Sequence, residues 1–226
     1  MSAATSKDIR RRRPGRFEIK SELNASSLRG VGLAFTNMFL ATLFIFFAIA
    51  NAKSFLANPR LSVLLIVITE SIVAFFLIVR RDPEETHHSW QTWVTTTLGT
   101  LAPFLLRPVD VESDQFIGSV LQISGFLLQI AALVALNRCL GLLPAYRGIK
   151  SGGLYAWVRH PLYLAYVITY LGYFLSNPSA ANLVVIVSGT VFLVLRIWYE
   201  ENLLLRYPEY KSYASRTRWR LLPAVW

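Results

Sequence analysis

The chain has 226 residues, of which 54% are hydrophobic and 16% are charged, and its mean hydropathy is +0.44. A soluble domain would carry about a quarter charged residues, so this composition excludes an ordinary water-soluble protein and indicates an integral membrane protein. The single cysteine, Cys139, excludes an internal disulfide framework and a metal site built from several cysteines.

Much of the net charge of +10 lies in the first thirty residues, and we predict that residues 1–30 form a basic cytoplasmic segment. Four consecutive arginines at 10–13 are followed by Arg16 and Lys20. Such a cluster attracts anionic lipid headgroups by about 1 kcal/mol per residue. The segment is too long and too rich in arginine to be a cleaved signal peptide. It is better interpreted as a determinant of membrane topology than as a nucleic-acid-binding tail.

Apolar runs of suitable length predict the membrane spans, because a hydrocarbon core of about 30 Å needs roughly 20 apolar residues per helix. The predicted spans are 31–50, 61–79, 90–106, 116–136, 162–176 and 181–199. The third contains a threonine run and Pro103, and the fifth is short. Only residues 177–180 join the last two, which predicts a tight helical hairpin.

The predicted fold is therefore an all-α integral membrane protein. We expect a bundle of about five or six transmembrane helices with a C-terminal helical hairpin and a cytoplasmic cap, in which residues 31–226 form a single domain. If the N-terminus is cytoplasmic, 19 of the 23 lysines and arginines face the cytoplasm and three face outward. The positive-inside rule then predicts an even number of spans with both termini in the cytoplasm.

Two polar stretches interrupt this apolar pattern: SGGLYAWVRHPLY at 151–163 and RIWYEE at 196–201. Ionisable residues within or beside a membrane segment are costly, so they commonly mark a functional site. Arg196 and Glu200 are four residues apart and share one helical face, where they form either a simple salt bridge or part of a site.

The first stretch places His160 immediately before Pro161, a residue that suits the first turn of a helix. The free N–H groups of such a helix start attract an anion. His160 is therefore either a structural histidine or a ligand-binding one. The same stretch contains Tyr155, Trp157 and Tyr163. Tyrosine and tryptophan are common at membrane interfaces, and we expect Trp157 to be such an anchor.

Together with YPEYKSYASRT at 207–217, these motifs resemble isoprenylcysteine carboxyl methyltransferases. They are also similar to the wider family of small integral membrane methyltransferases that includes phospholipid methyltransferases. The resemblance covers residues 137–223 and implies an S-adenosylmethionine pocket that faces the cytoplasm. The positions that match cofactor-binding residues are Arg147, Gly148, Ile149, Lys150, Tyr155, His160, Pro161, Leu162, Tyr163 and Glu200.

The resemblance further implies that Arg196 binds the substrate and that Arg196 and Glu200 are the catalytic residues. Arg147 departs from the pattern, since it stands where the eukaryotic enzymes carry a histidine. In chemical terms, tyrosine faces suit the sulfonium of the cofactor. Glu200 suits its ribose hydroxyls or amino group, and the helix start with His160 suits its carboxylate.

The expected reaction is methyl transfer to a lipid-like or prenylated acceptor at the cytoplasmic membrane face. Carboxylate O-methylation of an isoprenylcysteine-like substrate is favoured, because Arg196 can grip a carboxylate with two hydrogen bonds. The alternatives are a lipid amine N-methyltransferase, an NADPH-dependent reductase of the sterol type, and a non-catalytic protein that kept the fold.

Other polar residues indicate packing more than chemistry. His87 and His88 follow two glutamates in a loop without helical spacing, and we predict no metal site there. Glu70 falls near the middle of the second span, where it either lines a cavity or pairs with a polar neighbour. Gly118 and Gly125 suit close packing of the fourth span against another helix.

Overall fold

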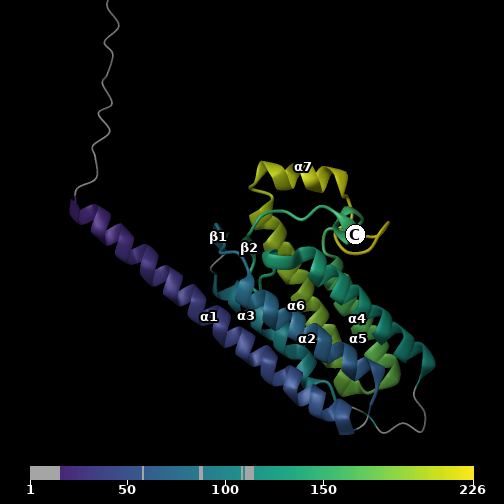
Figure 1. The fold of residues 1–226 in the computed structure, drawn as a ribbon. Helices are drawn as coiled ribbons and strands as arrows, with labels where there is room; N and C mark the ends of the chain where they lie inside the picture. Colours follow the sequence, from purple (N-terminus) through teal and green to yellow (C-terminus); the bar gives the residue numbers. More distant parts are fainter. Residues whose placement is uncertain (1–15, 58, 87–88, 108, 110–114) are drawn as a thin grey trace, which may run out of the picture. The chain divides into compact units, whose positions relative to one another are not determined.

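The computed structural model describes residues 16–57, 59–86, 89–107, 109 and 115–226. Within this part the fold is helical apart from one pair of two-residue strands (Figure 1). The chain divides into two compact units, residues 1–37 and 38–226. The α-helices are α1 (Arg16–Ala57), α2 (Leu61–Val79), α3 (Trp90–Leu101), α4 (Phe116–Leu136), α5 (Pro161–Ser176), α6 (Ala180–Leu204) and α7 (Pro208–Arg216).

Among the described residues, four helices are long and apolar enough to cross a membrane, so the chain is a multi-pass membrane protein. They are Ala34–Ala57, Leu61–Val79, Phe116–Cys139 and Ala180–Leu204. The other two predicted spans are shorter. Helix α5 has 16 residues, and α3 has 12 before Pro103 shifts the chain into a 3₁₀ turn, Ala102–Leu105. The prediction of five or six spans is thus confirmed for four of them.

One end of the second unit gathers the polar connections, and we call it the polar end. Strand β1 (Glu85–Thr86) follows α2 and pairs antiparallel with β2 (Ala145–Tyr146), which follows α4. The backbone N–H groups of Arg159 and His160 donate to the carbonyls of Trp219 and Arg220, each at 2.9 Å. The segment that precedes α5 and the C-terminal tail therefore meet.

The opposite end of this unit is closed by two asparagines at the α5–α6 turn. The Asn182 side chain accepts from the N–H of Arg107 at 3.0 Å and donates to the carbonyl of Arg107 at 2.8 Å. Asn177 accepts from the N–H of Val109 at 3.0 Å. These bonds tie the chain after α3 to the predicted helical hairpin, which is present as α5 and α6. The α3 segment therefore runs from the polar end to the opposite end.

Helices α4 and α5 approach each other through glycines. A Cβ atom on Gly172 would lie 2.6 Å from the backbone nitrogen of Gln122 and 2.7 Å from the carbonyl oxygen of Gly118. A Cβ atom on Gly125 would lie 2.8 Å from the backbone nitrogen of Thr169. Backbone therefore packs against backbone along this contact, as small residues permit between membrane helices. The prediction that Gly118 and Gly125 serve close packing is confirmed.

We expect Gly172→Ala to lower the thermal stability of the detergent-solubilised protein, because the new methyl group overlaps the α4 backbone. Overpacking of this kind costs about 1–3 kcal/mol. The control is Gly99→Ala on α3, where the nearest atom to a new Cβ lies at 3.4 Å. Melting temperatures should fall for the first variant and stay close to wild type for the second. Equal melting temperatures for both would contradict the close contact.

Candidate functional site

A narrow pocket opens at the polar end, with a cavity volume of about 80 Å³. Its walls come from the end of α4, the segment after β2, the starts of α5 and α7, and the end of α6. Residues that line it include Leu136, Cys139, Arg147, Gly148, Ile149, Lys150, Tyr155, Arg159, His160, Leu162, Tyr163, Glu200, Tyr210 and Tyr213.

Local sequence explains why these segments can curve around a pocket. Gly148 has φ +89°, a backbone conformation that residues with a side chain rarely adopt, so the chain can turn within 147–150. Pro161 starts α5, and its ring presets the backbone for the first helical turn. His160 is thereby held at the mouth of the helix, with its backbone N–H bonded to the tail.

The centre of the polar end is the Glu201 carboxylate, whose residue is only 3% exposed. Its Oε1 atom lies 3.0 Å from His160 Nε2, accepts from the Tyr210 hydroxyl at 2.8 Å, and lies 3.3 Å from Arg159 Nε. Its Oε2 atom lies 3.5 Å from Arg220 Nε. One buried carboxylate thus joins α6 to the start of α5, to α7 and to the C-terminal tail. A buried charge persists only when it is paired and hydrogen-bonded in this way.

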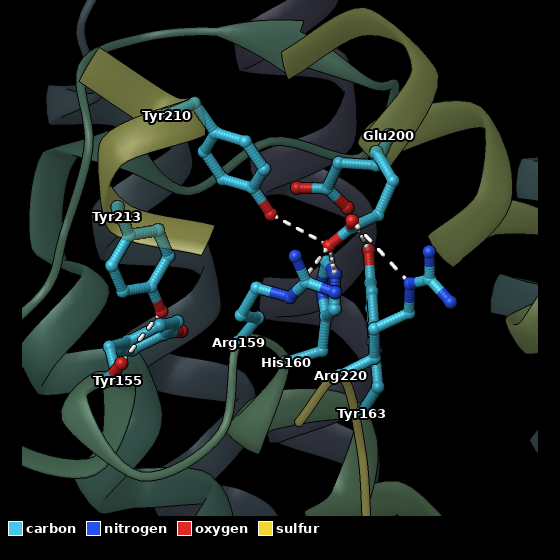
Figure 2. A network of polar contacts seen from close by, with 9 residues as sticks. Tyr155, Arg159, His160, Tyr163, Glu200, Tyr210, Tyr213 and Arg220 are labelled. Carbon is cyan, nitrogen blue, oxygen red and sulfur yellow. Dashed lines mark hydrogen bonds and ion pairs between the residues drawn. The ribbon is translucent and has the colours of Figure 1, made fainter. Parts of the chain in front are cut away.

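The neighbouring carboxylate, Glu200, lines the pocket instead. Its Oε2 atom accepts from the Tyr163 hydroxyl at 2.8 Å (Figure 2). The Tyr163 ring stacks near the His160 ring, with centroids 5.4 Å apart. Glu200 therefore presents a negative charge to the pocket beside an aromatic pair.

Arg196 lies one turn before Glu200 but is not paired with it among the described residues. Its Nη2 atom donates to the carbonyl of Gly141 at 2.9 Å, and its guanidinium lies 5.3 Å from the centroid of the Tyr163 ring. Its Nε atom is buried and has no hydrogen-bond partner within the described chain. The simple salt bridge considered from the sequence is thus absent there, and Arg196 keeps an unused donor.

Arg147 supplies a buried positive charge to the same pocket. The side chain is 7% exposed, and its Nε atom donates to the carbonyl of Arg81 at 3.1 Å. Burial lowers the pKa of Arg147 to about 10, an effect that nearby Arg80 adds to and Glu200 opposes. This pKa stays above neutral pH, so Arg147 is a cation when the protein functions near pH 7.

The pocket is also rich in tyrosines held by hydrogen bonds. The Tyr213 hydroxyl donates to the carbonyl of Tyr155 at 2.6 Å (Figure 2). Burial raises the pKa of Tyr155, and burial together with the Glu201 carboxylate raises the pKa of Tyr210. Both phenols therefore stay neutral and can donate hydrogen bonds at any ordinary pH.

Nine of the ten cofactor positions predicted from the sequence line this pocket. The tenth, Pro161, is buried at the start of α5 and shapes the helix start instead. Arg196 does not line the pocket, but its guanidinium contacts the ring of Tyr163, which does line it. The sequence did not predict that Glu201 is the central carboxylate of the polar end, which we call the hub, or that Arg159 and Arg220 are its partners. The only signal in the sequence for this role was the adjacent pair of glutamates, Glu200 and Glu201.

Two further polar features of the sequence are the histidine pair at 87–88 and Glu70 in α2. His87 and His88 lie outside the described residues, and the described part of the chain contains no cluster of three or more metal-ligating side chains. Glu70 accepts from the Asn51 side chain at 3.3 Å. This favours the interpretation that Glu70 pairs with a polar neighbour.

The pocket thus lies among polar side chains at one end of a unit that contains long apolar helices. Residues 114–209 match the family model described as phospholipid methyltransferase. The match identifies residues 114–209 as a segment similar to that family of S-adenosylmethionine-dependent membrane methyltransferases. The match favours a methyltransferase over a reductase. No curated protein matches the chain.

The donor set of the pocket fits this cofactor, which carries a sulfonium, an ammonium and a carboxylate group. Glu200 offers an anion for a cationic group, and Arg147 and Lys150 offer cations for the carboxylate. Tyrosine faces attract a sulfonium by about 0.5–2 kcal/mol through the cation–π interaction. Each charge of the cofactor therefore has a complementary partner in the lining.

We expect Glu201→Ala to destabilise the protein strongly, because it leaves two arginines at the polar end without their buried partner. Removing one member of a buried ion pair costs about 3–5 kcal/mol. Glu85→Ala is the matched control, since the Glu85–Arg206 ion pair is exposed and such pairs contribute at most about 1 kcal/mol. Thermal unfolding of both variants would measure the difference, and equal shifts would contradict the hub.

Proposed function

We propose that the protein transfers the methyl group of S-adenosylmethionine to a lipid-like acceptor at the polar end, with a carboxylate as the methyl-accepting group. The observation that carries the choice of acceptor is the buried Nε atom of Arg196, a hydrogen-bond donor with no partner among the described residues. Buried polar groups are rarely left unsatisfied without a functional reason. A carboxylate bound there would satisfy this donor.

The cofactor would be held by the pocket lining. Glu200 would take its amino group or ribose hydroxyls, and Arg147 with Lys150 would take its carboxylate. When bound, the cofactor supplies an electrophilic methyl group on a cationic sulfur. The chain itself would contribute orientation of the two reactants and exclusion of water. No general base is required for a carboxylate acceptor, because it is already ionised at neutral pH.

The surroundings of Arg196 suit an acceptor with an apolar tail. Helix α6 exposes large apolar side chains over much of its length, including Val191, Leu195 and Trp198. A tail lying along this face would remain in the hydrocarbon region. Its head would reach Arg196 near the polar end of the same helix. This arrangement explains why an arginine lies within an otherwise apolar stretch of α6.

An amine acceptor is the second candidate, and the family match favours it, since that family is described as phospholipid methyltransferases. An ammonium group must lose a proton before it can accept a methyl group. A lipid amine would therefore need a nearby proton acceptor, for which Glu200 is the carboxylate exposed to the pocket.

We also propose that the polar end faces the cytoplasm, because most of the lysines and arginines belong to segments at this end or to the N-terminal segment. The domain organisation follows from this arrangement. Residues 1–30 would form a basic cytoplasmic segment that contacts anionic lipids, and residues 31–226 would form one methyltransferase domain whose cofactor-binding part is 137–223.

The cofactor site is tested by calorimetry with S-adenosylhomocysteine, the product form, on detergent-purified protein. We expect Glu200→Ala and His160→Ala to lose binding while they keep a folded far-ultraviolet spectrum. Arg196→Ala should bind as tightly as wild type but turn over far more slowly. Lys211→Ala, on the exposed side of α7, is the control for both measurements. Wild-type binding in the Glu200 and His160 variants would refute the site.

The acceptor class is tested by methyl transfer from radiolabelled cofactor to two lipid probes of equal chain length, a prenylated cysteine with a free carboxylate and an aminophospholipid. We expect label in the first, released by mild alkali as an ester is. Loss of this activity in Arg196→Ala, with no gain on the amine, would support the carboxylate reading. Alkali-stable label in the aminophospholipid alone would reject it in favour of N-methylation.

A further inference from the structure

The His160 imidazole uses only one of its two nitrogens within the protein. Its Nε2 atom lies 3.0 Å from the Glu201 carboxylate. Its Nδ1 atom makes no hydrogen bond with the described residues and does not cap the helix that follows. Among the described residues, the buried side-chain atoms that lack a hydrogen-bond partner do not include Nδ1. The His160 side chain lines the pocket. The Nδ1 atom is therefore the part of the ring that a ligand in the pocket can reach.

The charges around the ring decide which nitrogen carries the proton. Glu201 already faces two guanidinium groups, those of Arg159 and Arg220. A protonated imidazole would place a third cation against one buried carboxylate, and uncompensated buried charge is costly. The neutral ring that satisfies the carboxylate has its proton on Nε2. Its Nδ1 atom then carries a lone pair.

The acceptor atoms of the pocket lie together on one side. The His160 ring stacks near the Tyr163 ring, and the Tyr163 hydroxyl donates to Glu200. The imidazole and the Glu200 carboxylate are therefore both neighbours of one tyrosine. Of the three cationic residues that line the pocket, Arg159 is paired with Glu201, and Arg147 and Lys150 come from the different segment that follows β2. The acceptors of the pocket and the two cations not paired with Glu201 thus come from different segments.

We propose that Glu201 is a positioning residue that holds His160 with its Nδ1 lone pair directed into the pocket, where His160 and Glu200 together receive the ammonium group of the cofactor. The inference rests on the function proposed above and revises one sequence-based expectation. His160 receives a donor from the ligand and does not bind the cofactor carboxylate, which falls to Arg147 and Lys150.

The position of the proton on the His160 ring depends on all the groups that face it. They are Glu201 from α6, Arg159 from its own segment, Arg220 from the tail, Tyr210 from α7 through the shared carboxylate, and Tyr163 with Glu200 on the pocket side. Glu201 alone among them accepts from the imidazole. Replacing it by glutamine keeps the shape of the side chain but allows its amide to donate to Nε2, which would move the ring proton to Nδ1.

The first test needs no ligand. Nitrogen NMR on protein with isotope-labelled histidine side chains reports which ring nitrogen is protonated, and His160→Asn assigns the signal among the three histidines of the chain. We expect a protonated Nε2 and a bare Nδ1 in the wild type, and a proton moved onto Nδ1 in Glu201→Gln. A wild-type ring protonated on Nδ1 would overturn the proposal.

The second test separates the ammonium from the rest of the cofactor. Calorimetry compares S-adenosylhomocysteine with 5′-methylthioadenosine, which lacks the amino-acid part. We expect Glu201→Gln to weaken the first ligand by about tenfold or more, the usual effect of losing a hydrogen bond to a charged group, and to leave the second unchanged. Arg220→Lys, which keeps a cation beside Glu201 but changes the shape of that contact, should spare both.

Equal weakening of both ligands in Glu201→Gln would overturn the proposal, since it would indicate general distortion or a contact with the nucleoside. Weakening of S-adenosylhomocysteine alone in both Glu201→Gln and Arg220→Lys would also contradict it, because the effect would then follow any change in the contacts of Glu201 and not the ring proton. If the wild type binds neither ligand, the cofactor site itself is refuted, and the NMR result still decides whether Glu201 orients His160.

Discussion

The structure of the polar end depends on one buried carboxylate that has three hydrogen-bond partners and a further ion pair with Arg159. Glu201 is the only point at which α6, α7, the start of α5 and the C-terminal tail contact the same group within the described chain. Burying a charge at a membrane boundary is costly, and the surrounding hydrogen bonds offset that cost only when all segments are in place. The carboxylate thus makes assembly of the pocket cooperative, because a segment that moves away leaves the others with unbalanced charge.

The membrane helices could be predicted from sequence because apolar length is a strong local signal. The bounds of α2 and α4 coincide with their predicted spans, 61–79 and 116–136. Helix α6 was predicted to end at Tyr199 but continues to Leu204, because Glu200 and Glu201 find partners and need not leave the helix. Helix α3 stops early at the turn that contains Pro103. Local signals therefore fail where a tertiary partner or a proline decides the end of a helix.

The pocket lining could be predicted because it follows contiguous motifs, while the hub could not. The residues that hold Glu201 come from three places, and the tail reaches Arg159 and His160 through backbone hydrogen bonds alone. Backbone pairing leaves no side-chain pattern in the sequence. An arginine such as Arg220 therefore looks like any other basic residue in a C-terminal tail until its neighbours are known.

The glycine contact between α4 and α5 has a consequence for the response to bilayer thickness. Helix α5 has 16 residues, or about 24 Å at 1.5 Å per residue, which is less than a hydrocarbon core of about 30 Å. Because its backbone is packed directly on the longer α4, it cannot tilt independently to relieve this mismatch. A thicker membrane would instead load the ends of α5, and one of those ends is the His160–Pro161 corner of the pocket. The length of the lipid chains would thereby affect the geometry of the pocket through the packing of α5 on α4.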